Sequence, residues 1–138
     1  MLNSNNPTAI GERLARLEAE IISKNTFSTS EIDTGKIWTD GSPIYRQTFT
    51  MTAPESIVDG TYSSSSSSAI TNADKIISLN GIASTGNTSF SLPFISSGGY
   101  FIKLHFSDTN KKVYLNANGN SFSTVPVIVT IEYTKSTS

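Results

Sequence analysis

The sequence Val127-Ile128-Val129-Thr130-Ile131-Glu132-Tyr133 has an apolar or aromatic residue at every second position, with Thr130 and Glu132 between them. Successive side chains of a β-strand point to opposite faces, so this alternation is typical of a strand that buries one face. Valine, isoleucine and tyrosine are also residues that strands favour. The stretch therefore predicts a half-buried strand of an antiparallel sheet.

The same pattern occurs upstream, from Tyr100 to Phe106, where Lys103 and His105 fall opposite the apolar positions. Between the two predicted strands, residues 108–111 form a polar turn, and residues 113–115 lead into Asn116-Ala117-Asn118-Gly119-Asn120. Asn-Gly strongly favours a two-residue hairpin turn, so we expect a hairpin there. Further strands are expected near residues 47–51, 75–80 and 90–94.

Another hairpin is expected where Ile37-Trp38 and Ile44-Tyr45 flank the segment 39–43. Its Asp-Gly pair supplies a turn, and proline is tolerated at the first residue of a strand. Seven or eight short strands separated by turn signals predict a mainly β fold, an antiparallel β-sandwich or jelly-roll-like domain over residues 27–138. The serine run Ser63–Ser68 interrupts the pattern, and we interpret it as an exposed loop or loose edge, or else as a flexible linker.

Residues 1–26 differ from the rest of the chain. Asn6-Pro7 resembles a helix start, because asparagine caps free amides and proline has no amide to leave unpaired. The next apolar residues follow at steps of four, three and four, which is a heptad seam with positions d, a, d and a: Ile10, Leu14, Leu17 and Ile21. Arg13 at g and Glu18 at the following e are placed to pair across a parallel seam.

This pattern predicts a short N-terminal coiled-coil helix that joins several copies of the chain. The alternative is an amphipathic helix docked on its own domain, which would usually show a wider apolar stripe. Because isolated helices shorter than about 12 to 15 residues are marginal in water, two heptads alone cannot hold the chains together, and the β domain must take part in the oligomer as well. Leucine and isoleucine together at a and d leave two and three strands open.

Composition narrows the function classes. Charged residues make up 15% of the chain and the net charge is -1, so we expect no nucleic-acid partner. The chain has no cysteine, which excludes disulfides and thiolate chemistry. We find neither a signal peptide at Met1–Asn6 nor a stretch long enough for membrane insertion, so we expect synthesis and assembly in the cytoplasm.

Motifs for catalysis are weak. His105 is the only histidine, no Gly-x-Ser-x-Gly elbow accompanies it, and its expected role is that of an exposed or hydrogen-bonded strand residue. The carboxylates are scattered, and Asp108-Thr109-Asn110 lacks the glycine and glutamate of an EF-hand. We therefore expect no enzyme activity, no cofactor and no metal. Trp38 is expected to be a core or intersubunit anchor rather than a platform for sugar stacking.

The segment from Phe27 to Phe49 resembles a segment of bacteriophage minor structural and tail-fibre proteins, in which an opening Tyr-Ser-Thr-Glu-Glu precedes Trp-x-Asp-Gly-Lys-Pro-x-Tyr-Arg. Phe27 replaces the usual tyrosine and Ser42 the usual lysine. A looser match continues through residues 76–81 and 113–115 to residues 129–135. The residues that carry the resemblance most specifically are Trp38, Asp40, Gly41, Pro43, Tyr45 and Arg46.

The resemblance implies a β domain at the tip or shaft of a trimeric virion appendage, a tail fibre or a head fibre, often connected with host attachment. Residues 1–8 would then be an anchor peptide that docks on another virion protein. Weak, multivalent contact with host cell-surface polysaccharide is the expected role of the outer loops. The contact residues that we expect are turn-borne amides: Asn116, Asn118, Asn120 and Asn87.

Two other functions stay open from the sequence. The first is a purely structural capsid or tail decoration protein without a ligand of its own. The second is a glycan-degrading enzyme, which would need a close pair of carboxylates.

Overall fold

The computed structural model describes the backbone of residues 7–25 and 27–136 and the side chains of residues 9–18 and 27–136. Within these residues the chain forms one helix, nine strands and a short 3-10 turn: α1 (Pro7–Asn25), β1 (Ile32–Ile37), β2 (Pro43–Thr52), β3 (Tyr62–Ser66), β4 (Ala73–Thr85), β5 (Thr88–Ser91), β6 (Phe94–Ile95), β7 (Phe101–Ser107), β8 (Lys112–Asn118), η1 (Asn120–Phe122) and β9 (Pro126–Lys135). The fold is mainly β, as the sequence predicts.

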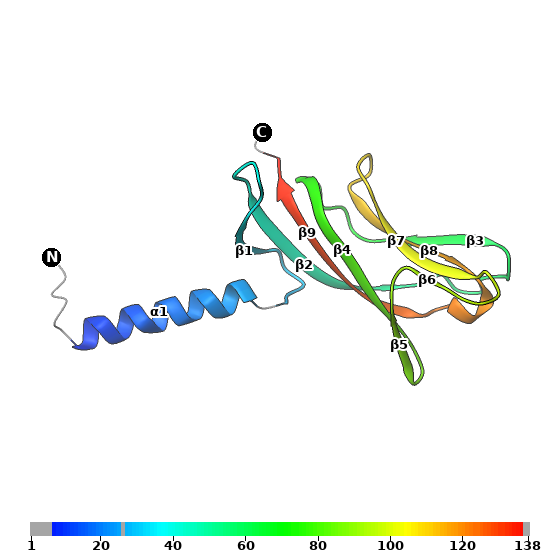
Figure 1. The fold of residues 1–138 in the computed structure, drawn as a ribbon, viewed down its shortest axis with the longest axis horizontal. Coiled ribbons are helices and arrows are strands. Elements are labelled where there is room, and N and C mark those ends of the chain that lie inside the picture. Colours follow the sequence, from blue (N-terminus) through cyan, green and yellow to red (C-terminus); the bar gives the residue numbers. More distant parts are fainter. Residues whose placement is uncertain (1–6, 26, 137–138) are drawn as a thin grey trace.

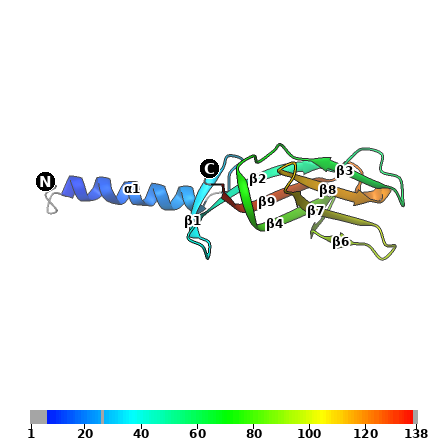
Figure 2. The same ribbon diagram turned by 90° about the horizontal axis from the view of Figure 1, so that it is seen from above.

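The strands form two antiparallel sheets (Figures 1 and 2). The first sheet has the order β1-β2-β9-β4-β5, and the second has the order β3-β8-β7-β6. Both sheets contribute side chains to one apolar core, with Val129 and Ile131 from β9 and Ile102 and Leu115 from the second sheet at 0% exposure. The β domain is thus built from two layers that share a core.

The alternation predicted for β9 is confirmed. Val127, Val129, Ile131 and Tyr133 are fully buried, while Ile128 on the opposite face is 55% exposed. β9 lies at the centre of the first sheet, paired with β2 on one side and with β4 on the other. A strand in that position must bury one face, which is the reason for its strict period of two.

The β1–β2 hairpin is also confirmed: Ile37 lies opposite Pro43, which is the first residue of β2. In β7, Ile102 is buried while Lys103 and His105 are exposed, as expected. The turn at residues 108–111 joins β7 to β8.

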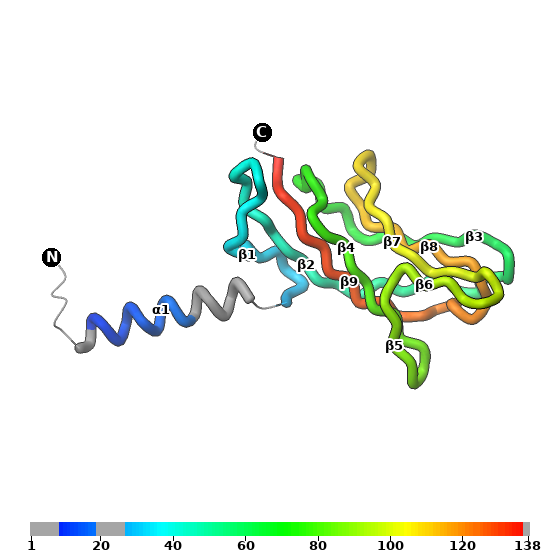
Figure 3. The backbone as a smooth tube through the Cα atoms, in the orientation of Figure 1, coloured from blue at the N-terminus to red at the C-terminus, as the bar shows by residue number. Residues whose placement is uncertain are grey.

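The hairpin expected at Asn118-Gly119 is wrong. β8 pairs with β3 and β7, whereas β9 lies in the other sheet. The chain passes between the sheets through η1 (Figure 3), with Phe122 buried between them. Gly119 has φ +136°, and a Cβ there would lie 2.9 Å from Cβ of Tyr100. Burial of Phe122 therefore outweighs the local turn preference of Asn-Gly.

The interpretation of the serine run as a loop is wrong for Ser63–Ser66, which lie within β3 and pair with β8. The alternative of an edge is right, because β3 is the outermost strand of the second sheet. Backbone hydrogen bonds need no apolar side chain, so serines are tolerated where only the ladder has to form.

α1 begins at Pro7, as predicted, and projects from the end of the domain where β1 lies (Figures 1 and 2). Three residues of the predicted seam are exposed: Ile10 at 42%, Leu14 at 55% and Leu17 at 53%. Arg13 and Glu18 are exposed too. The side chain of Ile21 and residues 1–6, which include most of the expected anchor peptide, lie outside the described residues.

Candidate functional site

Several of the residues that carry the resemblance form the turn of the β1–β2 hairpin. The amide of Trp38 donates to the carbonyl of Ser42 at 2.8 Å, and the amide of Gly41 donates to the carbonyl of Trp38 at 2.9 Å. Gly41 has φ +88°, which glycine adopts without steric cost. Asp40 Oδ1 accepts a hydrogen bond from the amide of Ser42 at 2.9 Å. These residues therefore shape the hairpin tip.

Asp40 also ties this tip to β4. Lys75 Nζ donates to Asp40 Oδ2 at 2.8 Å. The bond from Lys75, together with the amide of Ser42, holds the pKa of Asp40 well below its usual range, and Asp40 in turn raises the pKa of Lys75. Both side chains are about half exposed, so the pair orients the hairpin and adds little stability.

Trp38 lies half-buried beside this tip and is not part of the apolar core, so the expectation of a core anchor is wrong. It lines a shallow surface depression together with Lys75 and Phe106. Trp38 therefore lies beside residues of β4 at the surface and not in the core between the sheets. An intersubunit role of Trp38 stays a prediction.

Arg46 lies on the outer face of the first sheet, 9% exposed, opposite Glu132 of β9. Its Nη1 is 3.5 Å from Glu132 Oε2, and Lys36 Nζ approaches the same oxygen at 3.5 Å. The guanidinium carbon lies 4.5 Å from the ring centroid of Phe27, a cation–π contact. Arg46 therefore attaches the start of the β domain to the centre of the first sheet.

Tyr133 of β9 organises a second polar cluster. Although it is fully buried, its hydroxyl donates to Glu31 Oε2 at 2.5 Å and lies 3.2 Å from Gln47 Oε1. Glu31 forms an ion pair with Lys135, whose Nζ lies 4.1 Å from the ring centroid of Tyr45. Burial, and then the hydrogen bond and charge of Glu31, raise the pKa of Tyr133 far above its usual value. The cluster therefore fastens Glu31, which directly precedes β1, to the core.

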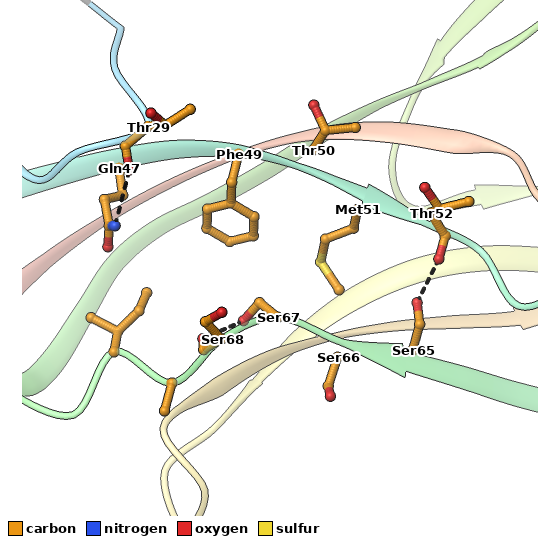
Figure 4. Close-up of a pocket in the computed structure, with 12 residues that line it drawn as sticks. Thr29, Gln47, Phe49, Thr50, Met51, Thr52, Ser65, Ser66, Ser67 and Ser68 are labelled. Carbon is orange, nitrogen blue, oxygen red and sulfur yellow. Dashed lines mark hydrogen bonds between the residues drawn. The ribbon is translucent and has the colours of Figure 1, made fainter.

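A cleft opens between the two sheets, where β2 and β3 face each other (Figure 4). β1 pairs with β2 only as far as Arg46, and β3 is the edge of the second sheet. Two strand edges therefore meet with no further strand to cover the gap. The cleft has a volume of about 450 Å³.

One wall of this cleft comes from β2. Gln47, Phe49 and Met51 alternate along the strand and point toward the opposite wall (Figure 4). Their partners in β9 are the buried residues Ile131, Val129 and Val127, so this row continues the core toward the surface. Met51 is 6% exposed and Phe49 is half-buried. The β2 wall is thus largely apolar with one amide.

The other wall is the end of the serine run and the segment that follows it. Ser65 Oγ donates to the carbonyl of Thr52 at 2.9 Å, which bridges the two walls at one end. Ser67 is held against β8, because its Oγ accepts from the amide of Val113 at 3.0 Å. Serine side chains are too small to reach Phe49 and Met51, so the cleft stays open.

The remaining lining residues carry no formal charge either. The full lining of the cleft is Thr29, Gln47, Phe49, Thr50, Met51, Thr52, Ser65, Ser66, Ser67, Ser68, Ala69 and Ile70. The cleft therefore combines apolar side chains with hydroxyl and amide groups, and has no acid, base or cation in its walls.

The expected contact residue Asn116 lies elsewhere and is buried, at 1% exposure, within β8. Its Oδ1 accepts from Tyr62 Oη at 2.5 Å and from Ser64 Oγ at 3.0 Å, and its Nδ2 lies 2.6 Å from His105 Nδ1. His105 stacks on Tyr114 with 5.2 Å between ring centroids. The expectation that the Asn116 amide projects from a turn toward a ligand is wrong, because it cross-links three strands.

The other three expected contact residues do not gather at one place. Asn118 ends β8, half-buried, and its Oδ1 accepts from the amide of Gly60 at 2.9 Å. Asn120 is exposed in η1, where its amide donates to Asp59 Oδ1 at 2.7 Å. Asn87 is exposed in the turn between β4 and β5. Of the four, only Asn87 and Asn120 are exposed, and their side-chain amides make no hydrogen bond within residues 27–136.

The cleft was not foreseen from the sequence. Gln47, Phe49 and Met51 alternate with threonines, a signal of a strand with one apolar face. Serine side chains are too short and polar to cover an apolar face, so the serine run indicates that the face opposite it stays partly uncovered. What the sequence could not provide is that these two segments oppose each other across the domain.

Among residues 7–25 and 27–136, no group of three or more His, Asp or Glu side chains is arranged to hold a metal ion. In the same residues, no helix is both long and apolar enough to cross a lipid bilayer. Comparisons with protein-family models, with curated proteins and with solved structures found no match to this chain.

Proposed function

We propose that this chain is a non-enzymatic fibre or appendage protein of a bacteriophage virion. In this proposal α1 joins three copies as a parallel coiled coil, and a β-sandwich domain faces outward and contacts host cell-surface glycans. The jelly-roll form of the domain stays a prediction. The resemblance supports the virion role, because its six specific residues build and fasten one hairpin, from Trp38 to Arg46.

The observation that carries the proposal is the exposed apolar seam of α1. Ile10, Leu14 and Leu17 share one face of a helix that projects from the β domain and remain 42 to 55% exposed. Three large apolar side chains in a row on a solvent-facing helix are unfavourable in a single chain, because each leaves its apolar surface in water. A second and third copy of the same seam would cover them, which is how coiled coils form.

The seam is tested by the mass of the protein in solution. We expect sedimentation equilibrium of the full chain to give three times the chain mass. The double variant Leu14→Asp/Leu17→Asp should lower this mass, because it places two charges in the seam. The matched control is Ala15→Asp at heptad position b, which should leave the trimer intact. A full chain that sediments as a monomer would contradict the proposal.

The glycan-contact part is tested separately, with the intact trimer on an array of bacterial surface polysaccharides. Multivalent display is essential, because weak single contacts add up only when several copies bind together. Absence of binding on the array would count against the receptor role and favour a second function, a structural decoration protein without its own ligand. The internal use of Asn116 and Asn118 favours this second function, since two expected contact residues stabilise the domain instead.

If the chain is a decoration protein, we expect it to stay on the particle and to bind no sugar. Removing residues 1–25 should release the protein from virions if this region contains the anchor. Persistence of the shortened chain on the particle would refute the anchor.

A further inference from the structure

We propose that the cleft between β2 and β3 binds one ring of a neutral saccharide. This inference rests on the glycan-contact part of the proposed function and gives it a site. It replaces the scattered asparagines that the sequence suggested with a single cavity whose walls come from two strands.

The size of the cleft fits a small ligand. Its volume of about 450 Å³ lies in the range of small-molecule sites, which are concave and largely preformed. It stays open because the wall opposite Phe49 and Met51 consists mostly of small residues, Ser65–Ser68 and Ala69, with Ile70 at its end. Longer side chains at these positions would fill the space and complete the core, as side chains do elsewhere between the two sheets.

The chemistry of the walls selects the ligand class. None of the twelve lining residues carries a formal charge. An ionised ligand would lose its hydration there without gaining a counter-charge, which is costly. A purely apolar ligand would in turn cover hydroxyl and amide groups without pairing them. A neutral molecule with an apolar face and a rim of hydroxyls meets both conditions, and a sugar ring has this form.

The side chains are placed to receive such a ring. Phe49 projects into the cleft and can lie against the C–H face of a sugar (Figure 4). Gln47 is held in place, since its Nε2 donates to the carbonyl of Thr29 at 3.3 Å and its Oε1 lies 3.2 Å from the hydroxyl of Tyr133. Within residues 27–136 the hydroxyl of Ser68 makes no hydrogen bond and is available to a ligand. Ordering of this kind lowers the entropic cost of binding.

The chain supplies its own probe for this cleft. It contains two methionines, and the side chain of Met51 lines the cleft (Figure 4). In the full chain with ¹³C-labelled methionine methyl groups, Met51 reports binding and Met1 serves as the reference signal. We would titrate it with methyl glucoside, methyl mannoside, methyl galactoside and N-acetylglucosamine, and with glucuronate as the charged counterpart.

We expect at least one neutral sugar to shift the Met51 signal saturably, with a Kd in the millimolar range, and glucuronate to leave it unchanged. Ser68→Phe places a ring at the mouth of the cleft and should weaken binding at least about tenfold. Ser91→Phe is the matched control: Ser91 is exposed in β5 and does not line the cleft, so the affinity of this variant should stay within about twofold of the unchanged chain. Phe49→Leu, which keeps the wall apolar but removes the ring, should weaken binding as well.

The inference is overturned if none of the four neutral sugars shifts Met51 at about 100 mM, if glucuronate shifts it equally, or if Ser68→Phe and Phe49→Leu both bind like the unchanged chain. Its failure is distinguishable from failure of the proposed function. A trimer that binds polysaccharide on the array without any effect at Met51 keeps the receptor role and removes only the cleft.

Discussion

Tyr133 has two roles, because its ring belongs to the alternating apolar pattern of β9 and its hydroxyl belongs to a polar cluster. Its ring occupies the core row of β9, while its hydroxyl bonds to Glu31 and lies near Gln47. Replacement by phenylalanine keeps the ring but leaves the half-buried acceptors on Glu31 and Gln47 without their donor. We expect Tyr133→Phe to lower the free energy of unfolding by about 1–3 kcal/mol.

Urea unfolding of the variant and the unchanged chain, at equal protein concentration, measures this difference. Tyr45→Phe is the matched control, because the ring of Tyr45 lies 6.5 Å from that of Tyr133 and its hydroxyl makes no hydrogen bond within residues 27–136. That control should change stability by less than about 0.5 kcal/mol. Equal effects of the two changes would show that the bond to Glu31 contributes nothing.

Asp40 makes stability depend on acid pH. Its pKa is lowered in the folded chain, chiefly by the hydrogen bond from Lys75. A lowered folded pKa contributes stability that is present above the unfolded pKa, about 4, and is lost as pH falls toward the folded pKa. Asp40→Asn keeps the turn acceptor but removes the charge. We expect it to lower Tm slightly at pH 7, and the difference from the unchanged chain to shrink between pH 4 and pH 2.

Thermal unfolding at a series of pH values checks this expectation. Glu55→Gln, which alters an exposed carboxylate outside the hairpin, should follow the unchanged chain throughout. A difference for Asp40→Asn that grows below pH 4 would have the wrong sign for the Asp40–Lys75 bond.

The two residues also differ in how far the sequence foresees them. The turn around Asp40 is local, since its hydrogen bonds join residues two to four positions apart, and Asp-Gly followed by proline predicted it correctly. The bond from Tyr133 to Glu31 joins positions 102 residues apart. No pattern along the chain encodes that pairing, because it follows from how the sheet brings distant segments together.

At the scale of elements, β9 holds the domain together. It is the central strand of the first sheet and contributes four fully buried side chains to the shared core. We expect Ile131→Ala to cost about 2–4 kcal/mol, because it removes buried methyl groups and leaves a cavity. Ile128→Ala on the exposed face of the same strand should cost less than about 0.5 kcal/mol.

Urea midpoints of these two variants at equal concentration give the comparison. A large effect at Ile128 would contradict this prediction and would mean that the outer face of the first sheet is covered in solution.

Period-two patterns predicted the strands with a buried face, such as β7 and β9, because burial imposes the pattern. They failed at β3, where serines pair through their backbones and no buried face is needed. They failed again at Asn118-Gly119, where burial of Phe122 carries the chain into the other sheet. The cleft lies next to β3, the first of these exceptions. No pattern along the sequence therefore predicts the position of the proposed binding site.

At the scale of the molecule, a helix with an exposed apolar row projects from a two-layer β domain. Apolar side chains fill the core between the two sheets, and the cleft opens where β2 and β3 face each other. The heptad spacing of Ile10, Leu14 and Leu17 predicted the seam, because a helix places such residues on one face. It could not predict the number of copies, since two-stranded and three-stranded assemblies use similar seams. We propose that copies of the chain associate in parallel through this seam.

The absence of cysteine from the sequence allows a direct measurement of that claim. A single Leu14→Cys change in the full chain places identical thiols side by side only if the helices are parallel and in register. After mild oxidation we expect a covalent dimer on a non-reducing gel for Leu14→Cys and little for Ala15→Cys, which faces away from the seam. Leu14→Cys chains that stay uncrosslinked, or that crosslink no more than Ala15→Cys chains, would contradict the account.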